Sequence, residues 1–476
     1  MIKIVVFLLF LLYPTMHLQI FSISTFGVSS SDIFIIILNC IFAYKFIWEG
    51  VELKLPKTSI HLYFISILVF SLISAFIPLF FLNEYHLLQF LKTFAHFLYL
   101  YLFAFFSLSF QIDNKLIFKA IQIYLVTALF ANIYGIYQLI ARALDLPWGW
   151  VDLNNISLVS RTDSDATSFK QLALKFKDFY RATSIFSEPS AFVQFNLIAL
   201  CFLALPFITK TKKIFKSQSF MIVMFILIAI NLLITFSLTG VLGLFLLILT
   251  SMFLERRELL KLYLKIFTFL AILLVIADYF ISDLVGLSVL EMLIDRVLGV
   301  FYYFLGIGDL VHGESLSWRL EVVFESFNVW FKNPLTGVGL GLFHANSDIA
   351  GFSDNSFLAL LAEAGPIAAF SFLFIFISSF YHAVKIRRST DLILNEYQKT
   401  MVNMLPYIIV ILFEVNFLTS NGWLGISFIV PLFIALNIIN SIYVTNNKYT
   451  LVKFRDYPLK NKFYESLANF LKIKSN

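Results

Sequence analysis

Two arginines stand next to apolar segments, where their chemistry suits a phosphate group. Arg181 lies in the run FYRATSIFSEPSAFVQF, which leads into a long apolar stretch, and Arg319 lies in SWRLEVVFESFNVWFKNPLTG. Arginine keeps its charge and offers paired N–H donors, which match the oxygens of a diphosphate. The two residues therefore predict anion binding. The run Ser187-Glu188-Pro189 is also typical of a plain helix start, with a capping side chain and proline in the first turn.

The second arginine belongs to an amphipathic helix of about 16 residues. The pattern starts this helix at Ser317 and ends it at Asn333-Pro334, since a residue before proline disfavours helix. Its apolar face consists of Leu320, Val323, Phe324, Phe327 and Phe331. We expect this helix to lie on the membrane surface or to pack on a bundle.

The elements that position these residues are membrane helices. Of the 476 residues, 60% are hydrophobic and only 13% are charged, and the mean hydropathy is +0.88. This composition excludes a free soluble enzyme, because a soluble surface needs more polar residues. Cys40 and Cys201 lie inside apolar runs, which argues against a disulfide or a metal site. The sequence predicts an all-α polytopic membrane protein.

About twelve transmembrane helices are expected. They cover 2–22, 32–48, 59–82, 86–110, 115–141, 189–208, 218–236, 238–254, 265–284, 354–381, 402–420 and 423–445. We predict a transmembrane domain over 1–445 and a basic tail over 446–476, which could form an interfacial helix.

The positive charges predict the orientation. Short connections such as TKTKKIFKS and KIRRS are rich in Lys and Arg and fall on one side, together with the tail. Cytoplasmic loops carry this excess. Both termini are therefore expected in the cytoplasm, and the two large loops, 142–188 and 285–353, are expected outside.

Three polar stripes lie within the expected spans. They consist of Gln89, Lys92 and His96; of Gly135, Gln138 and Arg142; and of Asn355, Ala359, Ala362 and Glu363. Polar groups in lipid usually face a cavity or a partner, so the stripes predict a polar chamber in the outer half of the membrane. Helix–helix packing is the alternative for each stripe, although the Lys92 ammonium still needs a partner or an anion.

Two motifs resemble those of the O-antigen polymerase/ligase superfamily. One joins Arg319, the run NPLTGVGLGLF, Asp354-Asn355 and Glu363-Ala-Gly365; the other is Arg181 followed by Phe186 and Glu188-Pro189. The resemblance implies a fold similar to GT-C glycosyltransferases and a substrate linked to polyprenyl diphosphate, such as undecaprenyl diphosphate. It implies no cofactor, metal or nucleotide. Arg181 and Arg319 would hold the diphosphate, with Lys92 and Arg142 as further candidate ligands. Glu188, Asp354, Asn355 and Glu363 occupy motif positions.

One departure bears on the reaction. Ligases of this superfamily usually carry His directly before the Asn of the second motif, and here that residue is Asp354. This favours a polymerase over a ligase. Candidates for the general base are Asp354, Glu188 and His344, in that order, although Asp354 could simply cap a helix. Ser184 stands where the family often has Gly.

The predicted function is thus polymerisation of lipid-linked oligosaccharide repeats by inverting glycosyl transfer in the bacterial inner membrane. An O-antigen ligase that acts on lipid A core is one alternative, and a lipid-linked oligosaccharide flippase is another. Expected partners are the polyprenyl-diphosphate-linked oligosaccharide and membrane lipids, with a chain-length regulator and a flippase as further candidates and no nucleic acid.

Overall fold

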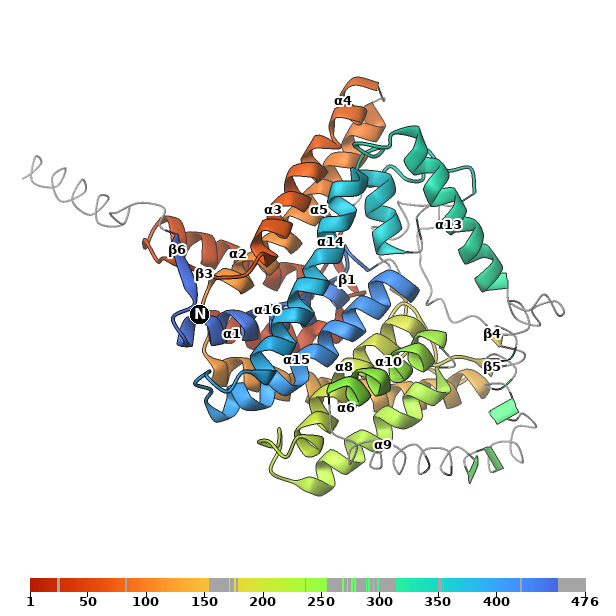
Figure 1. Cartoon of the computed structure of the whole chain (residues 1–476). Coiled ribbons are helices and arrows are strands. Elements are labelled where there is room, and N and C mark those ends of the chain that lie inside the picture. Colours follow the sequence, from red (N-terminus) through yellow and green to blue (C-terminus); the bar gives the residue numbers. More distant parts are fainter. Residues whose placement is uncertain are drawn as a thin grey trace, which may run out of the picture.

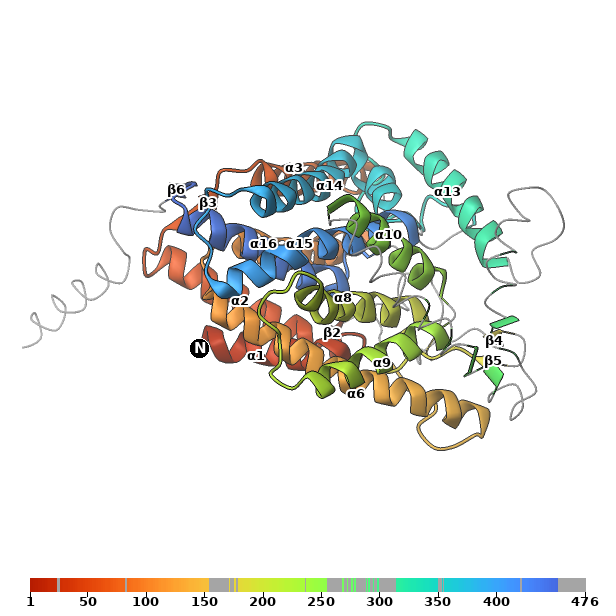
Figure 2. The ribbon, with the colours of Figure 1, turned by 60° about the horizontal axis from the view of Figure 1, so that its bottom comes forward.

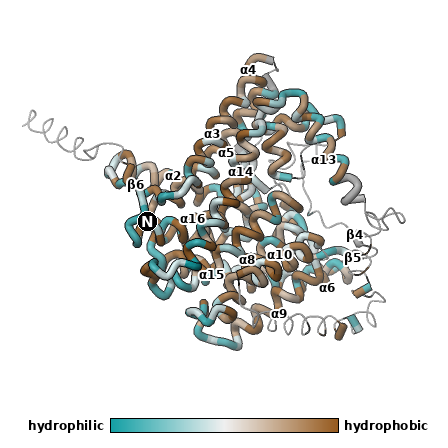
Figure 3. The backbone as a smooth tube through the Cα atoms, viewed as in Figure 1, coloured by the Kyte–Doolittle hydropathy of each residue, from teal (hydrophilic) through white to brown (hydrophobic). Residues whose placement is uncertain are grey.

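The chain folds as a bundle of helices in the computed structural model (Figure 1). The model describes residues 1–23, 26–81, 84–153, 171, 175–176, 179–235, 237–254, 314–349, 353, 355–419 and 422–452, with scattered positions between 268 and 298. Seven described helices are long and apolar enough to cross a membrane, and four shorter apolar segments accompany them. Figure 3 shows hydrophobic residues along most of these helices. The protein is therefore a mostly helical, multi-pass membrane protein.

The seven long helices are α2 (Ser30–Ile47), α5 (Glu84–Ser109), α6 (Asn114–Ala143), α8 (Pro189–Ile208), α14 (Ser356–Arg388), α15 (Glu396–Glu414) with the π-helical turn η2 (Val415–Thr419), and α16 (Ile426–Thr445). The shorter segments are α1 (Ile2–Leu12) with the 3₁₀ turn η1 (Tyr13–Thr15), α3 (Ile60–Ile73), α9 (Gln218–Ile234) and α10 (Leu238–Leu254). Two further helices are α4 (Phe76–Phe81) and α13 (Glu314–Lys332).

Three antiparallel pairs of short strands complete the described part of the fold. They are β1 (Gln19–Ile23) with β2 (Phe26–Ser29), β3 (Leu53–Pro56) with β6 (Tyr449–Val452), and β4 (Lys175–Phe176) with β5 (Phe179–Tyr180).

Two of the expected spans differ from the structure. The helix expected over 2–22 ends at Leu12 and continues as the turn η1 and the strand β1, because Pro14 cannot continue an α-helix without losing a backbone hydrogen bond. The span expected over 59–82 is broken at Ser74 into α3 and α4. The span expected over 265–284 lies almost wholly outside the described residues, so the total of twelve stays a prediction.

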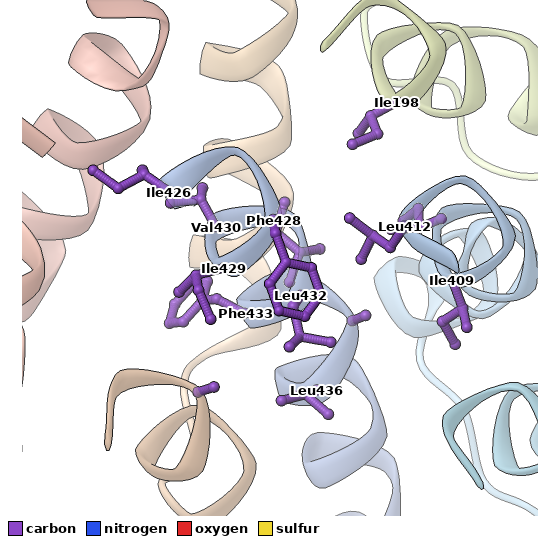
Figure 4. Close-up of a cluster of buried hydrophobic side chains, with 14 of the residues drawn as sticks. Ile198, Ile409, Leu412, Ile426, Phe428, Ile429, Val430, Leu432, Phe433 and Leu436 are labelled. Atoms are coloured by element: carbon purple, nitrogen blue, oxygen red, sulfur yellow. The ribbon is translucent and has the colours of Figure 1, made fainter. Parts of the chain in front are cut away.

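Helix α16 forms the centre of the bundle. It packs against α5, α8, α14 and α15, and its side chains fill the space between them (Figure 4). Phe433 stacks on Phe103 of α5, with ring centroids 4.8 Å apart, while Leu412 of α15 and Ile198 of α8 border the same cluster (Figure 4). A helix that is apolar on all sides and buried in this way is typical of the core of a large bundle.

The connections predicted to be cytoplasmic gather at one end of the bundle. Strand β3, in the connection before α3, pairs with β6 at the start of the tail. Lys212, in the connection before α9, forms a 3.2 Å ion pair with Glu396 at the start of α15. Figure 2 shows β3, β6 and the N-terminus at one end and α13, β4 and β5 at the other. This arrangement supports the predicted grouping of the loops. The predicted tail helix lies outside the described residues.

Helix α13 forms where the sequence predicts it, but its aromatic face points away from the bundle. Val322 and Val329 are fully buried, whereas Phe324 and Phe331 are 68% and 66% exposed. The inward face therefore carries the smaller residues. The sequence predicts that this helix lies on the membrane surface or packs on the bundle with its aromatic face. For Phe324 and Phe331 the second expectation is wrong, and their side chains face the membrane surface or solvent.

The grouping of the loops predicts a labelling pattern. Lys216 and Ala345 are exposed and lie at the connection before α9 and at the opposite end, respectively. In a variant with Cys40 and Cys201 replaced by Ala, we expect Ala345→Cys to react with a membrane-impermeant maleimide in spheroplasts, while Lys216→Cys reacts only after permeabilisation. Labelling of Lys216→Cys from outside would contradict the predicted orientation.

Candidate active site

The segment from Arg181 to Ser187 is held in place by the guanidinium of Arg142. This arginine ends α6 and is buried. Its Nη1 donates to the carbonyl oxygen of Arg181 (2.6 Å), its Nη2 to the hydroxyl of Thr183 (2.9 Å) and its Nε to the carbonyl of Gly149 (2.7 Å). A fourth bond, from Nη2, reaches Gln171. These bonds use four of the five N–H donors of Arg142, which the sequence predicts to bind a phosphate.

Two buried amides complete this framework. The Gln138 side-chain oxygen accepts from the backbone N–H and the hydroxyl of Thr183, both at 3.0 Å. The Gln171 side-chain nitrogen donates to the carbonyls of Ser184 (2.6 Å) and Phe186 (2.8 Å). Buried backbone groups of a loop must find partners, and these side chains provide them. The stripe predicted on this helix, Gln138 and Arg142, therefore faces the motif segment instead of an open chamber.

The backbone at Ser184 explains why the resembling family often has Gly there. Ser184 has a φ of 51°, in the left-handed region that glycine adopts most easily. Its hydroxyl donates to the carbonyl of Ala131 on α6 (2.7 Å), which offsets part of the conformational cost. Serine is thus tolerated at the turn that precedes α8.

The end of the segment is fixed by a histidine near the N-terminus. Nδ1 of His17 accepts the backbone N–H of Ser187 (2.9 Å), and the ring packs edge-on against Phe186. Glu188 follows as the residue before α8, and its side chain makes no capping hydrogen bond. The helix-start explanation therefore accounts for Pro189 but not for the carboxylate of Glu188.

Arg181 is a buried cation within the described structure. It is 9% exposed, and its Nε has no hydrogen-bond partner among the described residues. Burial lowers the pKa of Arg181; the nearby carboxylate of Glu188 raises this pKa, and the charge of Arg319 lowers it. A buried charge beside a like charge is unfavourable. The site would therefore gain stability from a bound anion.

Arg319 approaches Arg181 from the other large loop. It lies near the start of α13, and its Nη1 donates to the carbonyl of Thr419 (2.8 Å) at the end of η2. Since its charge acts on Arg181, the two guanidinium groups lie within electrostatic range of one another. The structure thus places Glu188 and Arg319, from two segments far apart in the sequence, within electrostatic range of Arg181.

The glycine-rich run of the second motif docks against a kink in α14. Gly337 has a φ of 70° and Gly365 a φ of 81°, and a Cβ at either position would collide with backbone of the other segment, 2.3 Å from the Glu363 carbonyl carbon or 2.4 Å from the Leu335 oxygen. Only glycine allows both the conformation and this close approach. The run NPLTGVGLG is therefore a packing element.

Two polar members of the second motif take part in this docking. Oε2 of Glu363 accepts the backbone N–H of Gly341 (2.9 Å). Asn355 caps α14 by accepting the N–H groups of Phe357 and Leu358, and its side-chain nitrogen donates to the carbonyl of Phe417 in η2. Asn355 therefore joins the start of α14 to the turn that holds Arg319.

The remaining predicted residues surround this arrangement. Lys92 is half-buried on α5, next to Thr93, over which Gly341 packs closely. His96 stacks on Tyr99, with ring centroids 5.3 Å apart. His344 is half-buried in the turns after the glycine run. Asp354 lies outside the described residues, so its predicted roles stay predictions.

Sequence reasoning missed three residues near the site. Gln171 and His17 bind the first motif segment. Gln171 stands in the first large loop and His17 near the end of the first expected span, where an isolated polar residue gives little signal. Glu414 is fully buried in α15, and its carboxylate lies beside the Thr419 hydroxyl, although neither oxygen meets hydrogen-bond geometry with a described donor. A lone carboxylate within an apolar span is a signal that could have found it.

A comparison with protein families gives a match to part of the chain. Residues 223–373 match the model of the family described as O-antigen ligase. This range contains Arg319, Asn355 and Glu363, while Arg181 lies before it. The match supports the resemblance to the O-antigen polymerase/ligase superfamily that was drawn from the motifs. A search of curated proteins finds no match to the chain.

The different surroundings of Arg142 and Arg181 predict opposite effects on stability. Arg142→Met should lower the melting temperature of the purified protein by several degrees or more, because each buried acceptor left unpaired costs about 1–3 kcal/mol. Arg181→Met should leave the melting temperature unchanged or raise it, because it removes a poorly compensated buried charge. Thermal unfolding in detergent measures both. Equal destabilisation by the two variants would mean that Arg181 is structural.

Proposed function

We propose that this protein polymerises lipid-linked oligosaccharide repeat units of O-antigen or a related surface polysaccharide. In this reaction the growing glycan leaves its polyprenyl diphosphate and is transferred to a sugar hydroxyl of an incoming lipid-linked repeat. The superfamily supports a glycosyl-transfer enzyme of polysaccharide assembly with lipid-linked oligosaccharide substrates. The finer assignment rests on the site.

The observation that carries the proposal is the pair formed by Arg181 and Arg319. Departure of a lipid diphosphate builds negative charge on its oxygens, and preorganised cations stabilise that charge in the transition state. Three features of Arg181 support this role: it is buried, its carbonyl oxygen is bound by Arg142, and the charge of Arg319 lies within electrostatic range of it. Lys92, on the helix that contacts the glycine run, is a further candidate ligand.

The acceptor hydroxyl must lose a proton as it attacks. Asp354 remains the first candidate for the base, followed by Glu188 and His344. Glu188 is supported by its position beside Arg181 and by a carboxylate that does not cap α8. Direct attack of the hydroxyl on the anomeric carbon inverts that centre. A positioned base contributes about 10²–10⁴ in rate.

Other motif residues are assigned to support. Asn355 and Glu363 make backbone hydrogen bonds that fix α14 against η2 and the glycine run. Arg142 organises the first motif segment, so we no longer place it among the ligands of the diphosphate. These residues would affect the reaction through the position of Arg181 and Arg319.

A ligase is the main alternative. The matching family is described as O-antigen ligase, and such an enzyme would transfer the glycan to lipid A core. Asp354 in place of the usual His favours the polymerase. A flippase, the alternative from another class, does not require two converging arginines at one end of the bundle.

The proposed setting is the bacterial inner membrane, with both termini in the cytoplasm and the site on the outer face. The basic connections at the end opposite the site support this orientation. A flippase and a chain-length regulator are proposed partners, because polymerisation requires a supply of lipid-linked repeats and control of the chain length.

The decisive assay mixes the purified protein with a defined polyprenyl-diphosphate repeat and resolves the products on a gel. We expect a ladder from the wild type and a loss of at least about 10²–10³ in rate from Arg181→Ala or Arg319→Ala. Arg319→Lys should restore only part of the activity, because a point charge lacks the paired donors.

Arg388→Ala is the matched control. This arginine is exposed near the opposite end of α14, and its loss should leave the ladder unchanged. A normal ladder from either site variant would contradict the proposal. A single transfer to lipid A core without a ladder would indicate the ligase.

A further inference from the structure

A basic cleft lies at the end of the bundle opposite the candidate active site. Its volume is about 210 Å³, and it is bordered by the last turns of α14 and α16. Lys57, Lys385 and Lys448 line it, and the lining contains no acidic residue. Three exposed lysines from three separate segments therefore border one cleft.

The fold explains why these lysines converge. Strands β3 and β6 pair so that Pro56 lies opposite Tyr449, and the backbone N–H of Lys57 donates to the carbonyl of Lys448 (3.0 Å). Lys385 reaches the cleft from the last turn of α14. The strand pair thus holds the backbones of Lys57 and Lys448 side by side.

No ion pair neutralises these three lysines among the described residues. The ion pairs found in that part of the chain join Lys45 to Glu49 and Lys212 to Glu396. Lys385 lies 5.7 Å from the ring centroid of Tyr381, a contact that leaves its charge intact. Like charges held together in this way repel one another, and an anion would relieve the repulsion.

The other lining groups suit a phosphate that carries a lipid. The hydroxyls of Ser389 and Tyr443 border the cleft, and the Tyr443 hydroxyl is fixed by a 2.6 Å hydrogen bond with Nδ1 of His382. Ile386, Leu392 and Ile442 form the apolar part of the lining. The cleft combines cations, hydroxyl donors and an apolar wall.

We propose that this cleft binds the phosphate headgroup of an anionic glycerophospholipid from the leaflet at that end. Basic pockets between membrane helices on the cytoplasmic side bind such headgroups. The lysines would contact the phosphate, the two hydroxyls would orient it, and the apolar wall would receive the start of an acyl chain. This site is separate from Arg181 and Arg319 and does not depend on the proposed function.

The test measures binding of phosphatidylglycerol by the full-length protein in phosphatidylcholine nanodiscs. Native mass spectrometry counts retained lipid, and thermal unfolding follows the stabilisation as phosphatidylglycerol is increased. The double variant Lys57→Ala/Lys448→Ala should bind phosphatidylglycerol at least about tenfold more weakly than the wild type. Its melting temperature in pure phosphatidylcholine should match or exceed that of the wild type, because the variant removes two like charges; this value shows that it folds. Lys385→Met, which keeps the aliphatic stem, should weaken binding in the same direction.

The double variant Lys216→Ala/Lys399→Ala is the matched control, because it removes the same charge from two exposed lysines that do not line the cleft. It should bind within about twofold of the wild type. Equal loss of binding in this control would overturn the proposal, since net charge alone would explain the effect. A full stabilisation by inorganic phosphate without lipid would also overturn it, in favour of a soluble phosphate compound.

Discussion

The site depends on the burial of one guanidinium group. Arg181 is almost fully enclosed, yet the charges near it are one carboxylate and a second arginine. Such a group is costly to keep in a fold. Around it, Arg142, Gln138 and Gln171 satisfy the hydrogen-bonding groups of the backbone next to Arg181. The charge of Arg181 itself remains unfavourable to bury, and a bound anion would stabilise it. This is the arrangement expected of a binding site for a diphosphate.

The second arginine is positioned by a chain of packed elements. The glycine run fits into the kink of α14, Asn355 at the start of that helix binds η2, and Thr419 at the end of η2 accepts from Arg319. Short π-helical turns inside membrane helices often occur at functional sites. In this account a disturbance at Gly337 or Gly365 would reach Arg319 although neither glycine touches a substrate.

Much of this arrangement could be predicted from the sequence. The apolar runs predicted most of the helices, the spacing of aromatic residues predicted α13, and the chemistry of arginine singled out Arg181 and Arg319. Orientation within helices could not be predicted as well. Phe324 and Phe331 face outward because smaller residues fill the inner face of α13. Arg142 was predicted as a candidate phosphate ligand because three of its four hydrogen-bond acceptors, on Gln171, Arg181 and Thr183, lie far along the sequence. The same distance concealed the contacts of His17 and Gln171 with the first motif segment.

The central claim is that Arg181 and Arg319 hold the same diphosphate. A double-mutant cycle on the binding of a non-hydrolysable polyprenyl diphosphate analogue tests it most directly, because residues that share a ligand group are energetically coupled. The account predicts that the affinity loss of the Arg181→Ala/Arg319→Ala variant differs by at least about fivefold from the product of the two single losses. Independent, multiplicative losses, or unchanged affinity in either single variant, would contradict it.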